Sequence, residues 1–235
     1  FALSRAAGDP RFLYVSALTT KEDWAAWGEK LGLDRPLVAQ YGSWLGNAVR
    51  GDFGLSMWFK RDSFEIVMER LPATLQLGAA AFAFTMVVAV PLGVLSAVKR
   101  GSAWDYAGRV FALTGQSMPG FWLGIVLILV FAVEFHVVPT GRRDNWQSFF
   151  LPTVTLGWFP AAGMLRLVRS SMLEVMDSEF LKFARAKGVP SAKVIWKHAF
   201  RNAAIPVVTF TALVVVGLFL AGSIVAEMVF SYPGV

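Results

Sequence analysis

The sequence predicts an all-α membrane protein, a polytopic bundle of transmembrane helices. Hydrophobic residues make up 56% of the 235 residues, and charged residues make up only 16%. Each of four windows is about as long as the roughly 20 residues that cross a hydrocarbon core as a helix. A core helix of a soluble protein shows a polar face, so a soluble core is disfavoured. The windows without any Asp, Glu, Lys or Arg are 72–98, 110–133, 145–165 and 202–226.

These windows define the expected domain organisation. Residues 1–71 are mixed in character and form a separate extracytoplasmic segment, whereas residues 72–235 form the transmembrane domain. The parts expected within that domain are spans at about 72–98, 110–133, 147–168 and 203–226 and a charged loop at 169–202.

Basic residues predict the orientation of the spans. Three of them flank the connection at 99–109 and eight lie in the stretch 166–201, whereas the connection at 134–144 holds only two. The positive-inside rule therefore places the first two stretches in the cytoplasm. Basic residues also precede the first span, but a segment as long as 1–71 is largely exempt from the rule. Alternation then puts residues 1–71 outside, which predicts a further span before them.

The segment before the first span has two recognisable features. Residues Asp23–Leu31 predict a short helix, which Gly32 and Pro36 end. The amphipathic aromatic side chains that follow suit a membrane interface. These are Tyr41, Trp44, Trp58 and Phe59.

Two prolines fall inside the expected spans. Pro91 lies deep in the first span, after a start at Leu71-Pro72, and Pro119 lies in the second. Prolines kink helices and free backbone carbonyls, which a membrane tolerates where neighbours or a water-filled cavity satisfy them. Bent helices that line a substrate pathway and ordinary transmembrane packing explain these two prolines equally well.

Small residues predict close helix packing at two places. Gly120 and Gly124 have the GxxxG spacing, and Gly217 with Ala221 forms a looser pair. Such faces let helix backbones approach closely. The pattern does not distinguish packing within the chain from packing against a partner subunit.

The four windows contain no ionisable side chains that could transfer protons. Ionisable residues are absent from the four windows, although proton-coupled transporters usually place them there. Glu134 and Glu227 lie at span ends, where we expect solvated interfacial carboxylates. His136 and His198 have no second His or Cys at ligand spacing, so no metal site is expected.

Other classes of site are disfavoured as well. The chain has no Cys and no GxxxxGK[ST] motif, so it has neither a thiol chemistry nor a phosphate-binding loop of that kind. Its pI is about 9.8. The basic residues flank membrane spans, so we expect them to face anionic lipid and no nucleic acid. A membrane protein without ionisable relays or a nucleotide site would need an external motor to drive transport.

The stretch 177–206, which we call the elbow, is the expected attachment point. Its first half predicts a helix with Phe180, Phe183 and Ala184 on one apolar stripe. Gly188 provides the left-handed conformation that ends a helix, and Pro190 suits the first turn of the next helix. Two short helices that meet at a corner form a protrusion suited to docking another protein.

The second half of the elbow separates two stripes. The apolar stripe, which we expect to pack the corner, is Val194, Ile195, Ala199 and Ala203. The basic stripe, for which contact with a partner and contact with lipid headgroups are equally favoured, is Lys193, Lys197 and Arg201.

Motifs along the whole chain resemble one family. The run ARAKG at 184–188, followed by His198, Phe200-Arg201-Asn202-Ala203 and Pro206, resembles the cytoplasmic EAA loop of permease subunits of ABC importers. It is most similar to the dipeptide/oligopeptide/nickel branch, in which Lys182 and Phe183 in place of Glu and Ala are typical departures. Further matching motifs, in the expected order, are LGLDRP, RGDFGLS, RLPATLQLG, SMPGFWLG and FSYPGV.

The resemblance implies a six-span subunit of the inner (cytoplasmic) membrane, of which this chain shows about four spans. Such a subunit forms a pathway for peptides by alternating access. The implied partners are a second homologous permease, two ABC ATPase subunits, an extracytoplasmic solute-binding protein and membrane lipid. ATP and Mg²⁺ bind to the ATPases, so this chain is not an enzyme and needs no cofactor of its own.

By the same resemblance the elbow couples the chain to an ATPase, mainly through Ser191–Ala199. The residues assigned to this coupling are Phe180, Phe183, Ala184, Arg185, Lys187, Gly188, Pro190, Ser191, Lys193, Val194, Ile195, Lys197, His198, Ala199 and Arg201.

Several alternatives remain open at this point. The same architecture serves the import of a nickel chelate or a glutathione-like solute, because selectivity in this family lies largely in the external binding protein. A secondary transporter or channel needs an ionisable residue or a filter in further spans, and its uptake persists without an ATPase. A non-transporting membrane scaffold shows no substrate-dependent ATPase response.

Overall fold

The computed structural model describes residues 1, 3, 5, 8–13, 20–56, 59–141, 145–219 and 223–234. Within them the regular structure is helical, and the only β pairing is an isolated bridge between Leu55 and Asp62. The predicted all-α membrane class is therefore confirmed. Contacts divide the chain into two compact units, Phe1–Glu69 and Arg70–Val235, so the division lies close to the expected one between residues 71 and 72.

The first unit contains the predicted short helix. The helices described in it are η1 (Pro10–Leu13), α2 (Lys21–Lys30) and α3 (Leu37–Val49). Helix α2 begins earlier than expected because Thr20 and Asp23 form a reciprocal capping box. It ends at Lys30, and Gly32 follows with a φ of +63°, in the left-handed region that ends a helix.

The interfacial aromatics of this unit are largely exposed. The rings of Tyr41 and Trp44 on α3 lie next to each other in a tilted arrangement, at a centroid distance of 5.9 Å, and no residue of α3 is buried. Phe59 is also exposed, whereas Trp58 lies outside the described residues.

Helix α4 (Ser63–Val98) is 36 residues long and starts well before the first apolar window. The Asp62 side chain begins it by accepting hydrogen bonds from the backbone N–H groups of Phe64 and Glu65, at 2.8 and 3.1 Å. Pro72 therefore lies inside the helix and not in its first turn, so that expectation was wrong. Pro91 also lies inside α4. The apolar window marks the part suited to the membrane, but the cap decides where the helix begins.

The second expected span is a bent pair of helices. Helix α5 (Ala103–Ser117) and the segment Gly120–Glu134, composed of α6 (Gly120–Leu127) and the π-helix η2 (Ile128–Glu134), are inclined by 110°. Pro119 is the N-cap of α6, and the residue before it has extended backbone angles, as a residue before proline prefers. Pro119 thus separates two helices and does not kink one.

The third and fourth expected spans are longer on the predicted cytoplasmic side than their apolar windows. The third combines η3 (Trp146–Phe149) with α7 (Phe150–Met176). The fourth begins at Ser191 and consists of α9 (Ser191–Lys193), the π-helix η4 (Val194–Ala199) and α10 (Phe200–Gly217). Helix α11 (Ser223–Phe230) comes next among the described helices.

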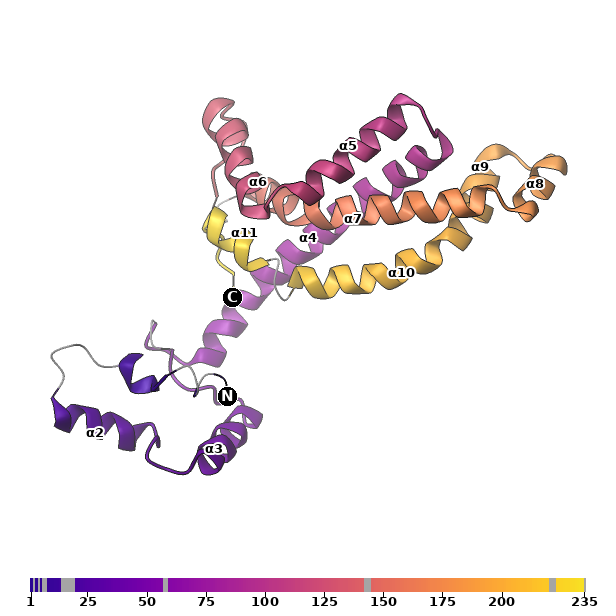
Figure 1. Cartoon of the computed structure of the whole chain (residues 1–235). Coiled ribbons are helices and arrows are strands. Elements are labelled where there is room, and N and C mark those ends of the chain that lie inside the picture. Colours follow the sequence, from indigo (N-terminus) through magenta and orange to yellow (C-terminus); the bar gives the residue numbers. More distant parts are fainter. Residues whose placement is uncertain are drawn as a thin grey trace. The chain divides into compact units, whose positions relative to one another are not determined.

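Three of the described helical stretches are long and apolar enough to cross a membrane, or four if the bent pair counts as one span. Helix α7 is central to the second unit: Figure 1 shows it between α5 and α10, and it also packs against α6 and α11. Its inward face is fully buried, with Met164, Leu165 and Val168 in the core. A Cβ at Gly115 on α5 would stand 2.5 Å from the Cβ of Ala162, so glycine permits this close approach.

Candidate functional site

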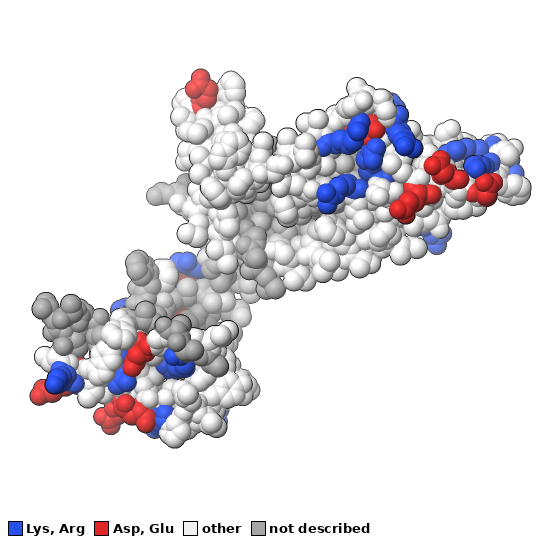
Figure 2. Space-filling view, in the orientation of Figure 1, with Lys and Arg blue, Asp and Glu red and all other residues white. Residues whose placement is uncertain are grey.

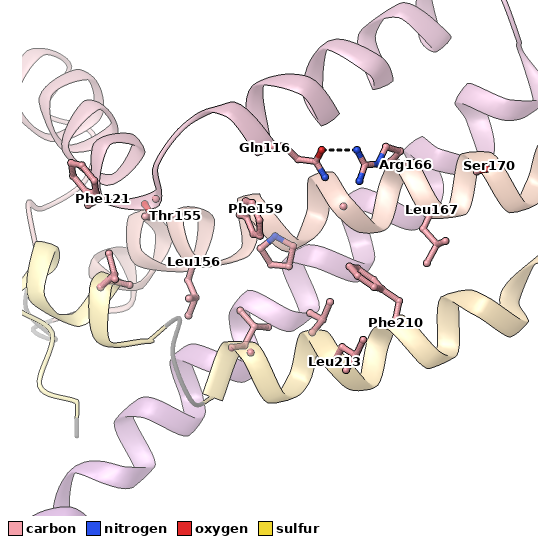
Figure 3. A pocket seen from close by; sticks show the side chains of 18 residues that line it. Gln116, Phe121, Thr155, Leu156, Phe159, Arg166, Leu167, Ser170, Phe210 and Leu213 are labelled. Carbon is pink, nitrogen blue, oxygen red and sulfur yellow. Dashed lines mark hydrogen bonds between the residues drawn. The ribbon is translucent and has the colours of Figure 1, made fainter. Parts of the chain in front are cut away.

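A cavity of about 990 Å³ lies among α5, α6, α7, α10 and α11 (Figure 3). Its lining is mainly apolar and aromatic, as in sites for small organic solutes. Phe121 and Phe159 line it on one side and Phe210 and Leu213 on the α10 side. Phe121, Phe159 and Leu213 are each more than half exposed, so the cavity is open in the single chain.

A polar pair lies in the wall of this cavity. Arg166 donates a hydrogen bond from Nη1 to Oε1 of Gln116 at 2.8 Å, which joins α7 to the end of α5 (Figure 3). The third apolar window ends at Leu165, so the sequence assigned Arg166 to the cytoplasmic side. The structure places it on α7, well before the helix ends at Met176.

The small residues predicted to pack helices occupy different environments. A Cβ at Gly124 would stand 3.0 Å from Val229 and 3.3 Å from Phe230, so α6 packs closely on α11 here. Gly120 and Gly217 line the cavity, and a Cβ at either would meet nothing within 4 Å. Neither packs a helix within the described chain, and packing against another subunit stays a prediction. Ala221 lies outside the described residues.

An ion pair that sequence reasoning missed ties α5 to α7. Arg169 donates to both carboxylate oxygens of Asp105, at 2.8 and 3.2 Å. Asp105 is only 2% exposed and also accepts hydrogen bonds from the Ser96 hydroxyl and the Gly101 backbone N–H. Ser96 is on α4, so this carboxylate joins three helices at one end of the unit.

Glu227 is buried, which contradicts the expectation of a solvated carboxylate. It is 7% exposed on α11 and accepts a 2.7 Å hydrogen bond from the hydroxyl of Thr74 on α4. A Cβ at Gly234 would collide with the carboxyl group of Glu227. The chain after α11 therefore folds back over this side chain. Glu134, by contrast, is exposed.

The corner of the elbow is a Schellman motif, in which backbone N–H groups after a helix bond back to its last carbonyls. Helix α8 (Glu179–Ala186) ends where the Gly188 N–H donates to the Arg185 carbonyl at 2.9 Å. The Val189 N–H donates to the Ala184 carbonyl at 3.2 Å. Gly188 has a φ of +78°, as its predicted role requires. Pro190 is the N-cap of the next helix and not its first residue.

The elbow is anchored by a buried apolar face. Leu181 is fully buried, and Val194 and Ala199 are buried with it in the main core. Ile195 and Ala184 pack against the same core while remaining partly accessible. The elbow is therefore held firmly against the transmembrane helices.

The outer face of the elbow carries large aromatic side chains. Phe180 is 46% exposed and Phe183 61% exposed, so most of the predicted apolar stripe points away from the core. Leu181, which the stripe omitted, provides the packing of α8. Trp196, which the assigned set omitted, is also about half exposed. In the sequence, the position of Trp196 within the amphipathic run did not distinguish it as a functional residue.

Charged side chains of both signs lie near this aromatic face. Figure 2 shows Lys and Arg gathered over α5, the later part of α7 and α8, with Asp and Glu between them. Lys187 lies over the ring of Phe183, at 4.4 Å from its centroid, and His198 is partly buried. The assigned polar residues that are exposed are Arg185, Lys187, Ser191, Lys193, Lys197 and Arg201.

Comparison with known proteins identifies the family of the chain. Residues 89–235 match a family described as "Binding-protein-dependent transport system inner membrane component". The chain is 40% identical over 227 residues to the glutathione transport system permease protein GsiC of Escherichia coli (strain K12), covering 97% of this chain and 74% of GsiC. It is 39% identical over 236 residues to the dipeptide transport system permease protein DppB of the same strain, covering 87% of this chain and 69% of DppB.

The matches include the helices that line the cavity and the whole elbow. They agree with the family that the motifs indicate, which is a family of transport subunits. The chain belongs to the inner membrane components of binding-protein-dependent transport systems, as a permease of the ABC importer type.

Proposed function

We propose that this chain forms part of the pathway by which an ATP-driven importer moves peptides across the cytoplasmic membrane by alternating access. The observation that carries the proposal is the connection between the cavity and the elbow. Two walls of the cavity are α7 and α10, and the elbow is the segment that links them. A force applied to the elbow therefore acts directly on both walls.

The buried anchor of the elbow supports this transmission. Leu181 and Val194 hold its two arms in the same core as α7 and α10. Because a packed core is not continuously deformable, a displaced elbow shifts whole helices and does not merely bend locally. Rocking of α7 against α10 opens and closes the cavity between them.

The motor in this proposal is a pair of ATPase subunits that bind ATP and Mg²⁺. The exposed rings of Phe180, Phe183 and Trp196 enter a groove on one ATPase, which gives the contact its apolar centre. The basic side chains around them contact acidic groups at the groove edge or lipid headgroups. This chain then supplies the pathway, and its partners supply the energy.

The remaining partners follow from the open side of the cavity and from the family. A second, related permease covers the exposed lining at Phe121, Phe159 and Leu213. An extracytoplasmic solute-binding protein delivers the solute, as the family description implies. The complex is thus heteromeric and embedded in membrane lipid.

The similar permeases favour two solutes. One is named for dipeptide transport and the other for glutathione transport. Both solutes are short and peptide-like, and both carry free carboxylates. We propose a peptide as the solute, with a glutathione-like molecule as the second candidate.

Uptake into vesicles tests this function. The complete complex, reconstituted with its binding protein, is expected to accumulate labelled alanyl-alanine or glutathione only when ATP is enclosed with the ATPases. Vesicles whose ATPases carry a disabled ATP site serve as the control. Uptake of equal rate in those vesicles contradicts the proposal and favours a secondary transporter or channel, and ATP hydrolysis that no solute stimulates favours a scaffold.

A further inference from the structure

We propose that Arg166, oriented by Gln116, binds a carboxylate group of the transported solute in the wall of the cavity. This inference rests on the proposed function, because it assigns a chemical group of the solute to one position in the same pathway. It names a residue that distinguishes solutes with a free carboxylate from those without one.

The charge of Arg166 is the first observation. Among the described residues that line the cavity it is the only charged one, and it forms no ion pair with any described carboxylate. One turn further along α7, Arg169 is neutralised by Asp105. The partner of Arg166 is instead a neutral amide, so its positive charge remains available.

The number of hydrogen-bond donors is the second observation. A guanidinium group has five N–H donors, and the Gln116 carbonyl oxygen accepts from Nη1 alone among the described contacts of Arg166. The remaining donors suit bidentate binding of a carboxylate. Both side chains are exposed in the single chain, so a solute that enters the cavity can reach the guanidinium group.

The direction of the side chain is the third observation. Side chains on a helix point towards its N-terminus, which for α7 is the end away from the elbow. Gln116 lies in that direction, because a Cβ at Gly163 would stand 3.9 Å from its Nε2 atom. Arg166 therefore extends along the cavity wall and does not reach back towards headgroups on the elbow side.

Gly163 lets an aromatic ring approach the pair closely. A Cβ at this position would stand 3.3 Å from the Phe210 ring on α10, which is a tight contact, and 3.9 Å from the Gln116 amide. A side chain there would displace the ring, so glycine keeps an aromatic surface of the cavity wall close to the Gln116 amide.

Transport of matched solutes tests the assignment in the complete complex. Uptake of alanyl-alanine is compared with that of alanyl-alanine carboxamide, which lacks the carboxylate but has nearly the same size. In R166Q, the ratio of acid to amide uptake is expected to fall by about five- to tenfold relative to the unmodified complex. Because both complexes receive solute from the same binding protein, its own preference cancels in this comparison.

The control variant is R100Q, which removes the same charge from an exposed position outside the cavity. It is expected to keep the unmodified ratio. If the Arg166–Gln116 pair has a purely structural role, R166Q lowers the uptake of both solutes equally and the ratio of acid to amide uptake stays unchanged. An unchanged ratio therefore overturns the inference, whereas ATP-driven uptake by the unmodified complex still supports the proposed function. If neither solute enters the unmodified complex, the proposed function fails for peptides, and the next measurement decides the inference alone.

Thiol labelling provides that measurement without transport. The chain has no Cys, so Ser170→Cys places one thiol in the cavity wall, one turn from Arg166. The measured quantity is the ratio of two labelling rates, that of the anionic sulfonatoethyl methanethiosulfonate divided by that of its cationic trimethylammonioethyl analogue. This ratio is expected to be higher when Arg166 is present than in R166Q. The expected difference in this ratio is roughly three- to tenfold. Equal ratios in the two proteins show that Arg166 attracts no anion there and contradict the inference.

Discussion

Asp105 and Arg169 form a bidentate ion pair that joins the start of α5 to the later part of α7. The carboxylate is nearly inaccessible and receives further hydrogen bonds from Ser96 on α4 and from the backbone of Gly101. Three helices thus meet at one satisfied charge, next to the end of the unit from which the elbow projects. A buried pair of this kind fixes the relative position of helices more than it adds net stability.

Breaking this pair is expected to destabilise the transmembrane unit. Asp105→Asn leaves Arg169 without its counter-charge, and Arg169→Gln leaves the buried carboxylate unpaired, at a cost of about 3–5 kcal/mol each. The double variant is expected to recover part of this loss, because no uncompensated charge remains. The thermal midpoint of the detergent-solubilised complex measures each effect.

Arg109→Gln is the matched control for this cycle. Arg109 approaches the same carboxylate only to 3.7 Å, and its side chain is about half exposed. An exposed pair contributes about 0–1 kcal/mol, so this variant is expected to melt close to the unmodified complex. If the loss of stability in the double variant equals the sum of the losses in Asp105→Asn and Arg169→Gln, the two residues do not stabilise the unit through their interaction.

The corner of the elbow is expected to be intolerant of branched side chains. Gly188 has a φ of +78°, which a β-branched residue adopts only under strain. Gly188→Val is therefore expected to abolish ATP-dependent uptake or to release the ATPases, while the transmembrane helices remain inserted. Gly188→Asn is the control, because Asn tolerates this conformation, and it is expected to retain most of the uptake. Full-rate uptake by the Val variant contradicts a coupling role for this corner.

Local signals in the sequence were sufficient for much of the elbow. Gly188 and Pro190 act on the residues directly beside them, so the corner was predictable. Which side of α8 faces the core was not, because Leu181 is buried where α8 packs on η4, beyond the corner. The stripe of Phe180 and Phe183 has the right periodicity but lies on the exposed side.

Apolar windows predicted the spans but not the ends or bends of the helices. Asp62 starts α4 before the window, and the extended residue before Pro119 divides the second window into two helices. Contacts across the fold left no signal in one sequence. The buried carboxylate of Glu227 accepts a hydrogen bond from Thr74 on another helix. The orientation of the Arg166 side chain along the cavity wall depends on its hydrogen bond to Gln116 on α5.

The contact between Thr74 and Glu227 gives a further prediction. Thr74→Val keeps the shape of the side chain but removes the hydroxyl that donates to the buried carboxylate. The expected loss is about 1–3 kcal/mol, because Glu227 then lacks a hydrogen bond in a site with little water. Thr74→Ser keeps the hydroxyl and is expected to lose less, and thermal midpoints of the three complexes test the difference. Equal midpoints for Val and threonine contradict a stabilising role for this bond.

The two glycines of the GxxxG spacing are expected to respond differently to the same change. Gly124→Val is expected to destabilise the chain by about 1–3 kcal/mol, because the new side chain overlaps Val229 and Phe230 on α11. Gly120→Val meets only open space within the chain, so its thermal midpoint is expected to stay close to that of the unmodified chain. Co-purification of the second permease then separates the two readings of this spacing. If Gly120→Val releases that subunit while this chain stays folded, Gly120 packs against the partner; if the subunit remains bound, the spacing marks an internal contact at Gly124 alone.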